Sequence, residues 1–311
     1  MLDALSKSFF HVLASSNGLK SLASAYGMRR PTSFARRFIA GETVAEALAA
    51  ARIVEQHQML VSLDLLGESV HSSNEANAAT KAYLSVIDAT IEAGVERNLS
   101  LKLTQLGLDV DRATAVDNLR RILEAAQRHD FFVRIDMENS PYTSATIEIF
   151  ETMWQLGYRN VGVVLQSALY RSEDDLTRVN TLGGRIRLVK GAYKEPKQVA
   201  RQSKAEVDDA YVRMMRTLLR DGTYPAFATH DPAMIDAVKA AATEGQVAKD
   251  RFEFQMLYGI RRDLQAALVR EGYRMRIYIP FGQEWFPYFM RRLGERPANV
   301  GFVLRSLMNE R

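Results

Sequence analysis

Residues 186–228 read IRLVKGAYKEPKQVARQSKAEVDDAYVRMMRTLLRDGTYPAFA and contain one strand–helix–strand unit. The run 186–189 is short and apolar apart from Arg187, and it contains the β-branched residues Ile186 and Val189, as expected of a strand. Apolar side chains then recur every three or four positions from Val207 to Leu218, which predicts a helix that stops near Gly222. A second apolar run, Ala226–Ala228, predicts the next strand.

The same alternation extends from residue 60 towards the C-terminus. Eight short apolar runs predict strands at Val61–Leu66, Leu99–Leu103, Phe131–Ile135, Val161–Leu165, Ile186–Val189, Ala226–Ala228, Phe252–Met256 and Met275–Ile279. Strands that alternate with helices indicate a parallel sheet, because parallel neighbours need a crossover connection. Since the chain has no Gly-rich dinucleotide fingerprint, we predict a closed α/β barrel of the (βα)8 TIM type rather than an open doubly wound sheet.

The first 58 residues have helical patterns and precede the first predicted strand. Thr43 and Glu46 match a capping box at the start of a helix over residues 44–57. No long linker rich in proline, glycine or serine interrupts the chain. We therefore expect an N-terminal helical arm, 1–58, and a barrel domain, 59–311, within a single domain overall.

Composition excludes several classes of site. The 41 basic and 37 acidic residues are dispersed, so nucleic acid is not an expected partner. The absence of cysteine excludes disulfides, thiolate metal sites and thiol nucleophiles. No signal peptide or membrane-spanning segment is expected. An apolar stripe near Leu5 and Phe9 predicts a helix that packs on the body. We therefore expect a cytoplasmic protein, with peripheral contact at the inner face of the cell membrane as the alternative.

Polar side chains follow nearly every predicted strand, at the end where barrels of this type place their sites. Lys102 lies within an apolar run, and a buried lysine is costly unless its charge meets a partner such as a ligand carboxylate. Asp136 is a functional carboxylate, an ion-pair partner of Arg134 or a helix cap, and Asp64 is expected to brace the first strand. A divalent metal held by acidic side chains and His230 is an alternative that the spacing does not require, and we expect none.

Residues 276–299 read RIYIPFGQEWFPYFMRRLGERPAN. The strand is expected to stop at Pro280, and the following helix carries Tyr288, Arg291 and Arg292. An aromatic side chain beside two cations suits a small ligand with an apolar body and one carboxylate. The alternative is an ordinary solvated charged face.

In these motifs the chain resembles the proline dehydrogenase family in its short monofunctional bacterial form. The matching stretches are 63–68 (LDLLGE), 100–103 (SLKL), 136–138 (DME), 164–172 (VLQSALYRS), 187–193 (RLVKGAY), 228–231 (ATHD), 252–259 (FEFQMLYG) and 276–299. They occur in the expected order and cover nearly all of residues 60–300.

The resemblance implies a distorted (βα)8 barrel that holds FAD without a Rossmann domain. It implies oxidation of L-proline to 1-pyrroline-5-carboxylate, the first step of proline catabolism to glutamate, with electrons passed to a membrane quinone. A separate pyrroline-5-carboxylate dehydrogenase would take the next step. Transferred to this sequence, the implied roles are an active-site pair, Asp136 and Arg187; a substrate site, Lys102, Arg291, Arg292, Tyr278 and Tyr288; and FAD contacts, Met137, Gln166, Lys190, Gly191, Ala192, Thr229 and His230.

Arg291 and Arg292 are adjacent, so their side chains diverge by roughly 100° around a helix. We therefore hypothesise that Arg291 mainly holds the substrate and that Arg292 also pairs with Glu68, closing the site as a gate. Two other functions remain alternatives at this point. One is a Schiff-base aldolase with Lys190 or Lys102 as nucleophile, and the other is a binding or scaffold barrel without activity.

Overall fold

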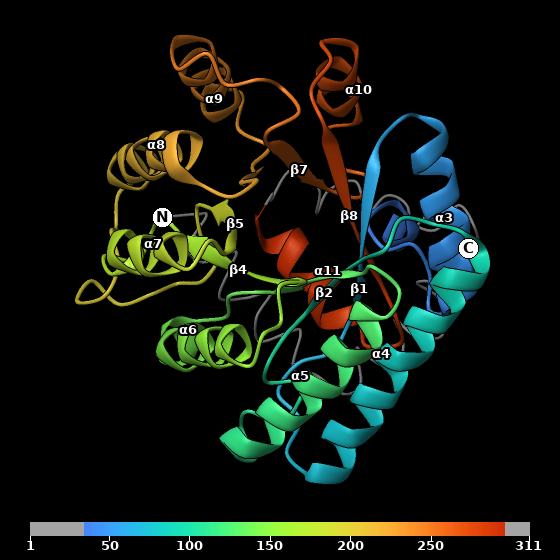
Figure 1. Ribbon diagram of the computed structural model, residues 1–311. Helices are drawn as coiled ribbons and strands as arrows, with labels where there is room; N and C mark the ends of the chain where they lie inside the picture. The colour runs from blue at the N-terminus through green and yellow to red at the C-terminus, as the bar shows by residue number, and fades with distance from the viewer. Residues whose placement is uncertain (1–33, 296–311) are drawn as a thin grey trace.

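The computed structural model describes residues 34–295, with side chains described as far as residue 290. Eight parallel strands form a closed barrel in sequence order, β1 to β8, each bonded to its neighbours and β8 to β1 (Figure 1). Their bounds are β1 Leu60–Leu65, β2 Asn98–Leu101, β3 Phe132–Ile135, β4 Val161–Gln166, β5 Arg185–Val189, β6 Ala226–Ala228, β7 Glu253–Leu257 and β8 Met275–Phe281. The predicted fold class is confirmed.

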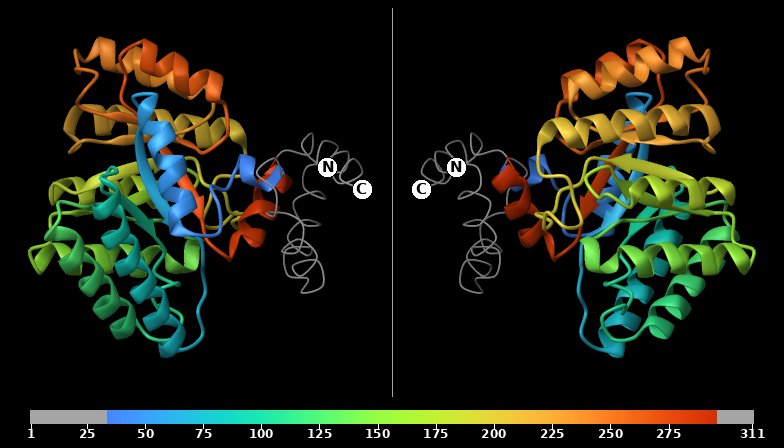
Figure 2. Two further views of the ribbon diagram at one scale, coloured as in Figure 1. Left: turned by 90° about the vertical axis from the view of Figure 1, so that its right-hand side faces the viewer. Right: turned by 90° about the vertical axis from the view of Figure 1, so that its left-hand side faces the viewer.

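Helices surround the barrel and connect successive strands (Figure 1). The helical segments are η1 Phe34–Arg37, α3 Val44–Gln56, α4 Ser73–Ala93, α5 Arg112–Gln127, α6 Ser140–Gln155, α7 Ser172–Thr181, α8 Lys204–Asp221, α9 Pro232–Glu244, α10 Arg262–Arg270 and α11 Trp285–Glu295. The last of these, α11, follows the carboxyl end of β8 and lies at one end of the molecule rather than in the ring (Figures 1 and 2).

Local signals explain where several helices begin and end. The Thr43 side chain accepts a hydrogen bond from the Glu46 backbone and Glu46 reaches back to Thr43, so the predicted capping box is confirmed. Helix α4 ends at Gly94, whose φ of 64° is a left-handed conformation that glycine adopts without strain. These short-range signals do not depend on the barrel.

Alternation along the strands separates two environments. Side chains that point outwards, such as Val61, Leu63 and Phe227, are buried against the helices in one continuous apolar core. The inward side chains are largely polar, whereas barrels of this type usually fill their interior with branched apolar residues. The polar interior therefore needs internal partners for its charges.

Such partners exist in the layer nearest the amino ends of the strands. Arg276 Nε lies 2.8 Å from Glu253 Oε1, and its Nη1 lies 3.0 Å from Glu96 Oε1. Arg134 is 4% exposed and donates to the backbone carbonyls of other strands. A Cβ on Gly162 would lie 2.7 Å from Arg134 Nη1, so glycine makes room for this guanidinium inside the barrel.

Several strand ends differ from the predicted ranges, and the ends of β8 and β2 bear on the site. Strand β8 continues through Pro280 to Phe281, so the expected stop at Pro280 is wrong. Pro280 lacks only the backbone N–H donor, and its carbonyl still accepts a hydrogen bond from the Ala40 backbone. Strand β1 also pairs with β8 at this position. Strand β2 ends at Leu101, which places Lys102 just beyond the strand.

Most of the expected N-terminal arm, residues 1–33, lies outside the described residues. The apolar stripe near Leu5 belongs to that part, so its packing stays a prediction, as does the division at residue 58. Among residues 34–295, no helix combines the length and the apolar character needed to cross a lipid bilayer.

Candidate active site

Three predicted site residues meet at the carboxyl ends of β3, β5 and β8. Arg187 Nη1 lies 2.7 Å from Asp136 Oδ1, and the Tyr278 hydroxyl donates to Asp136 Oδ2 at 2.7 Å. The Arg187 guanidinium lies over the Tyr278 ring, 5.2 Å from its centroid. Both Asp136 oxygens therefore receive a hydrogen bond, and one of these bonds comes from a cation.

Ser100 also belongs to this cluster, although it was not among the residues predicted for the site. Its hydroxyl accepts a hydrogen bond from Arg187 Nη2 at 3.0 Å and lies 3.2 Å from the Ser62 hydroxyl. The signal was present, because Ser100 and Lys102 are two residues apart and so share the inward face of β2 and its extension. Arg187 is thus fixed by a carboxylate on one strand and a hydroxyl on another.

The environment of Tyr278 keeps its phenol neutral. Desolvation inside the barrel mouth raises the pKa of Tyr278 well above its usual value, and the negative charges of Asp136 and Asp64 raise this pKa further. A neutral hydroxyl can donate to Asp136, which a phenolate could not do.

Lys102 and Asp64 form a second, looser pair beside this cluster. Lys102 is 8% exposed, and its Nζ lies 4.0 Å from Asp64 Oδ1. Asp64 is 1% exposed, and neither of its oxygens has a hydrogen bond from a described residue. The expected role of Asp64 in bracing β1 stays a prediction.

Gln166 and Glu138 line the neighbouring strand ends. The Gln166 amide donates to the Glu138 carbonyl at 2.9 Å, and the Glu138 carboxylate accepts from the Thr104 hydroxyl at 2.6 Å. Burial raises the pKa of Glu138 against these hydrogen bonds. Nearby, Gly191 has a φ of 113°, and a Cβ there would lie 3.1 Å from Gln166 Oε1. Glycine therefore keeps the backbone after β5 open to close approach.

Lys190 joins a cluster of charges between β5, α8 and α9. Its Nζ contacts Asp208 and lies 2.7 Å from Asp231 Oδ2, and Lys204 contacts both carboxylates. The hydrogen bond from Lys190 lowers the pKa of Asp231 to about 2, with Lys204 contributing. Thr229 is linked to the cluster because its hydroxyl accepts from the Asp231 backbone at 3.1 Å.

His230 and the acidic side chains near it were the candidate ligands of the metal alternative. His230 Nε2 accepts a hydrogen bond from the Leu257 backbone at 3.0 Å, so this ring nitrogen already has a partner on β7. Within residues 34–295, no three acidic or imidazole side chains are grouped so that they could hold a metal ion.

Helix α11 carries the remaining predicted residues. Tyr288 is 7% exposed and belongs to an apolar cluster with Phe38, Trp285 and Phe289. The backbones of residues 291 and 292 are helical, but their side chains lie outside the described set. Their roles, and the gate with Glu68, stay predictions.

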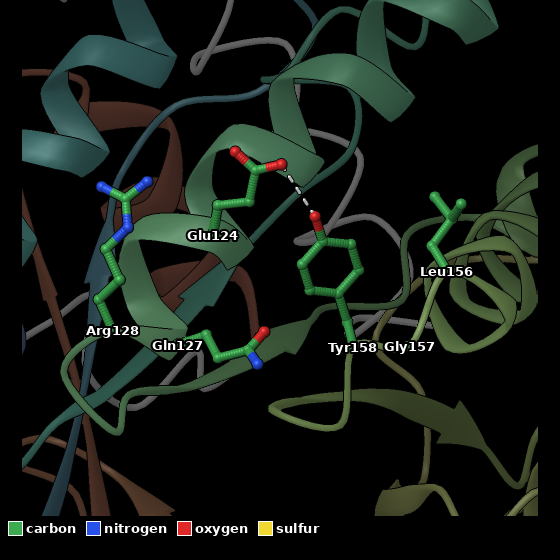
Figure 3. A pocket seen from close by; sticks show the side chains of 6 residues that line it. All are labelled: Glu124, Gln127, Arg128, Leu156, Gly157 and Tyr158. Carbon is green, nitrogen blue, oxygen red and sulfur yellow. Dashed lines mark hydrogen bonds between the residues drawn. The ribbon is translucent and has the colours of Figure 1, made fainter.

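A surface hollow lies elsewhere (Figure 3). It has a volume of about 520 Å³ and lies between the C-terminal ends of α5 and α6, where Tyr158 donates to Glu124 at 3.0 Å. Both helices lead into the amino ends of β3 and β4. Active sites in such barrels lie at the opposite end, the carboxyl ends of the strands, so this hollow is not the candidate active site.

Comparison with known proteins identifies the family. The proline dehydrogenase family model matches residues 47–305. The chain belongs to the proline dehydrogenase family. Proline dehydrogenase 2 of Bacillus subtilis (strain 168) is 39% identical over 97% of this chain and 99% of its own length. Proline dehydrogenase of Deinococcus radiodurans is 41% identical over 89% of this chain and 90% of its own.

A structural relative agrees with this family. The crystal structure of proline utilization A (PutA) from Bdellovibrio bacteriovorus inactivated by N-propargylglycine is 28% identical, with a TM-score of 0.78 over 83% of this chain and 32% of that one. The chain thus spans about a third of that longer relative. It is an enzyme, a proline dehydrogenase, and the aldolase and binding-protein alternatives are wrong.

Proposed function

We propose that the enzyme oxidises L-proline to 1-pyrroline-5-carboxylate with FAD as its cofactor. The observation that carries the proposal is the cluster of Asp136, Arg187 and Tyr278, fixed at the carboxyl ends of the strands in a proline dehydrogenase barrel. A rigid guanidinium beside a neutral phenol suits a reaction in which the protein mainly orients its reactants.

Two features fit FAD at this end of the barrel. Arg187 Nε is buried and donates to no described atom. A buried donor without an acceptor is costly, and a flavin ring offers acceptor atoms. The open backbone at Gly191 would let a planar ring approach the strand end. When bound, FAD supplies the acceptor for the hydride that leaves the substrate carbon beside nitrogen.

The proposed cofactor site consists of side chains and backbone that follow β3 to β6. Its members are Met137, Gln166, Lys190, Gly191, Ala192, Thr229 and His230. Lys190 is already held by Asp208 and Asp231, so it would act as a fixed charge rather than a mobile one. Arg187 would add positive charge where the reduced cofactor gains negative charge.

The proposed substrate site holds a carboxylate at one end and a ring at the other. Lys102, Arg291 and Arg292 would bind the carboxylate, since guanidinium and ammonium groups orient it by charge-assisted hydrogen bonds. Tyr278 and Tyr288 would form walls for the proline ring. We further propose that a membrane quinone accepts the electrons and that a separate dehydrogenase uses the product; bifunctional PutA of Escherichia coli is 29% identical, and the chain covers 24% of it.

An anaerobic absorption spectrum tests the proposal. The purified protein is expected to have a flavin spectrum that bleaches with L-proline, because hydride transfer reduces the cofactor, and not with D-proline. A flavin that L-proline leaves oxidised would contradict the proposed reaction. Protein that stays without flavin after reconstitution with FAD would contradict the proposed cofactor.

The gate between Glu68 and Arg292 is tested separately. Glu68 is exposed, so we expect Glu68→Ala to raise KM for L-proline modestly and to leave the flavin spectrum unchanged. Steady-state kinetics on both proteins measure this effect. An unchanged KM would remove the gate from the proposal.

A further inference from the structure

The two carboxylates at the mouth of the barrel have unequal surroundings. Asp136 accepts hydrogen bonds from Arg187 and Tyr278, both at 2.7 Å. Asp64 is more deeply buried, with 1% of its surface exposed, and no described residue donates a hydrogen bond to either of its oxygens. The ammonium group of Lys102 is 4.0 Å from Asp64 Oδ1, beyond hydrogen-bond distance. A buried acceptor in this state is costly unless a ligand or a proton satisfies it.

The charged and titratable groups around Asp64 come from five elements. They are Lys102 after β2, Asp136 after β3, Arg187 on β5, Tyr278 on β8 and Tyr83 on α4. Burial raises the pKa of Asp64 above its usual value, the charge of Lys102 opposes this rise, and Asp136 adds to it, while the Tyr278 hydroxyl and the charge of Arg187 also oppose it. When two carboxylates share a site, a proton goes to the one whose anion is less stabilised. Here the hydrogen bonds favour Asp64 as the proton acceptor, because Arg187 and Tyr278 donate to Asp136 and no described residue donates to Asp64.

The proposed reaction needs such a group. The amine of an amino acid is protonated at neutral pH, and a hydride cannot leave the carbon beside a nitrogen that has no lone pair. One N–H bond must therefore break first, and its proton needs an acceptor. Arg187 and the charged form of Lys102 have no lone pair to offer. Each oxygen of Asp136 already accepts one hydrogen bond, whereas the oxygens of Asp64 accept none from a described residue.

We propose that Asp64 is the proton acceptor for the substrate amine, while Asp136 serves to position Arg187. This inference rests on the proposed oxidation of L-proline. The N–H electrons stay on nitrogen and the proton forms an O–H bond with Asp64. The nitrogen lone pair then forms the C=N bond as the hydrogen of the adjacent carbon leaves, with two electrons, for the flavin acceptor. Lys102 contributes by keeping the anionic form of Asp64 accessible.

The test is the pH profile of kcat/KM for Asp64→Asn, an isosteric change that removes the base. The wild-type value should rise with pH through the pKa of Asp64 and then level off, because only the anion accepts a proton. The variant should be slower at neutral pH by on the order of 10²- to 10⁴-fold. Its deficit should shrink as pH rises, since hydroxide then removes the substrate proton in solution. A deficit that is the same at every pH, or a wild-type rate, would overturn the proposal.

A second measurement separates this role from a purely positional one. Cyclopentanecarboxylate has the ring and the carboxylate but no amine, so Asp64→Asn should bind it with the wild-type Kd. If the affinity of Asp64→Asn for cyclopentanecarboxylate falls in parallel with kcat/KM for L-proline, Asp64 acts only by positioning Lys102, and the proposal is wrong. Asp88→Asn, an exposed position on α4, is the matched control and should match the wild type in both measurements.

The proposed function is checked independently of Asp64. Bleaching of the wild-type flavin by L-proline must be observed first; if it fails, the proposed function fails rather than the role of Asp64. Should Asp64→Asn lose its flavin, Asp64→Glu decides the question. Asp64→Glu keeps a carboxylate base, so its kcat/KM should still rise with pH and then level off. If kcat/KM of this variant does not level off at high pH, the proposed role of Asp64 is wrong.

Discussion

Asp136→Asn is expected to lower kcat/KM for L-proline by on the order of 10²-fold or more. The amide can accept one hydrogen bond, but it has no charge to hold Arg187, whose guanidinium is nine-tenths buried. A group displaced by about 1 Å from the reacting atoms can cost that factor. Steady-state kinetics with L-proline, together with the flavin absorbance of the same samples, measure the effect.

A surface pair provides the matched control. Asp109 accepts a hydrogen bond from the Tyr142 hydroxyl at 2.6 Å, as Asp136 does from Tyr278, but it is exposed, in the connection between β2 and α5. Asp109→Asn should keep the wild-type kcat/KM. If Asp136→Asn also keeps it, the cluster with Arg187 does not orient the reactants.

Glu253→Gln is expected to lower the free energy of unfolding by roughly 3 kcal/mol or more. Arg276 is 6% exposed and sits 2.8 Å from Glu253 inside the barrel, so the variant leaves a buried guanidinium with much less compensation. Burial opposes ionisation of Glu253, but Arg276 more than offsets it and lowers the pKa of this carboxyl. The charge is therefore present at neutral pH, where denaturant unfolding should show the loss.

The control for this change is an exposed pair on the helices. Arg216 lies 2.8 Å from Glu244, and both side chains are more than half exposed. Glu244→Gln should change stability by no more than about 0.5 kcal/mol, because solvent screens exposed ion pairs. Equal losses in both variants would contradict the view that the ion pair inside the barrel stabilises the fold.

The partners of Asp136 illustrate the limit of sequence reasoning. Arg134, two residues away, was one partner that the sequence allowed, and the observed partner is Arg187, 51 positions further along the chain. Both 134 and 136 face the interior, but residues two apart on a strand are separated by about 6.6 Å along it. Arg134 therefore donates to backbone carbonyls near the amino ends of the strands. Asp136 lies nearer the carboxyl ends and accepts a hydrogen bond from Arg187 on β5.

The contacts of Lys190 and Asp64 also depend on residues that are distant in the sequence. The motif around Lys190 marked a site, but its carboxylate partners come from α8 and α9, and nothing in the motif predicts them. Asp64 belongs to a recognisable stretch, and its lack of a hydrogen bond depends on how far Lys102 and the neighbouring strands stand from it.

The sequence by itself determined the eight strands, their alternation with helices, the caps at Thr43 and Gly94, and the family. These features depend on the period of apolar residues and on backbone preferences within a few positions, which act over short distances along the chain. Closure of the barrel decided which charges meet in its interior. Hydrogen bonds and ion pairs need atoms within about 3–4 Å, and only the packing of all eight strands brings residues from distant positions that close.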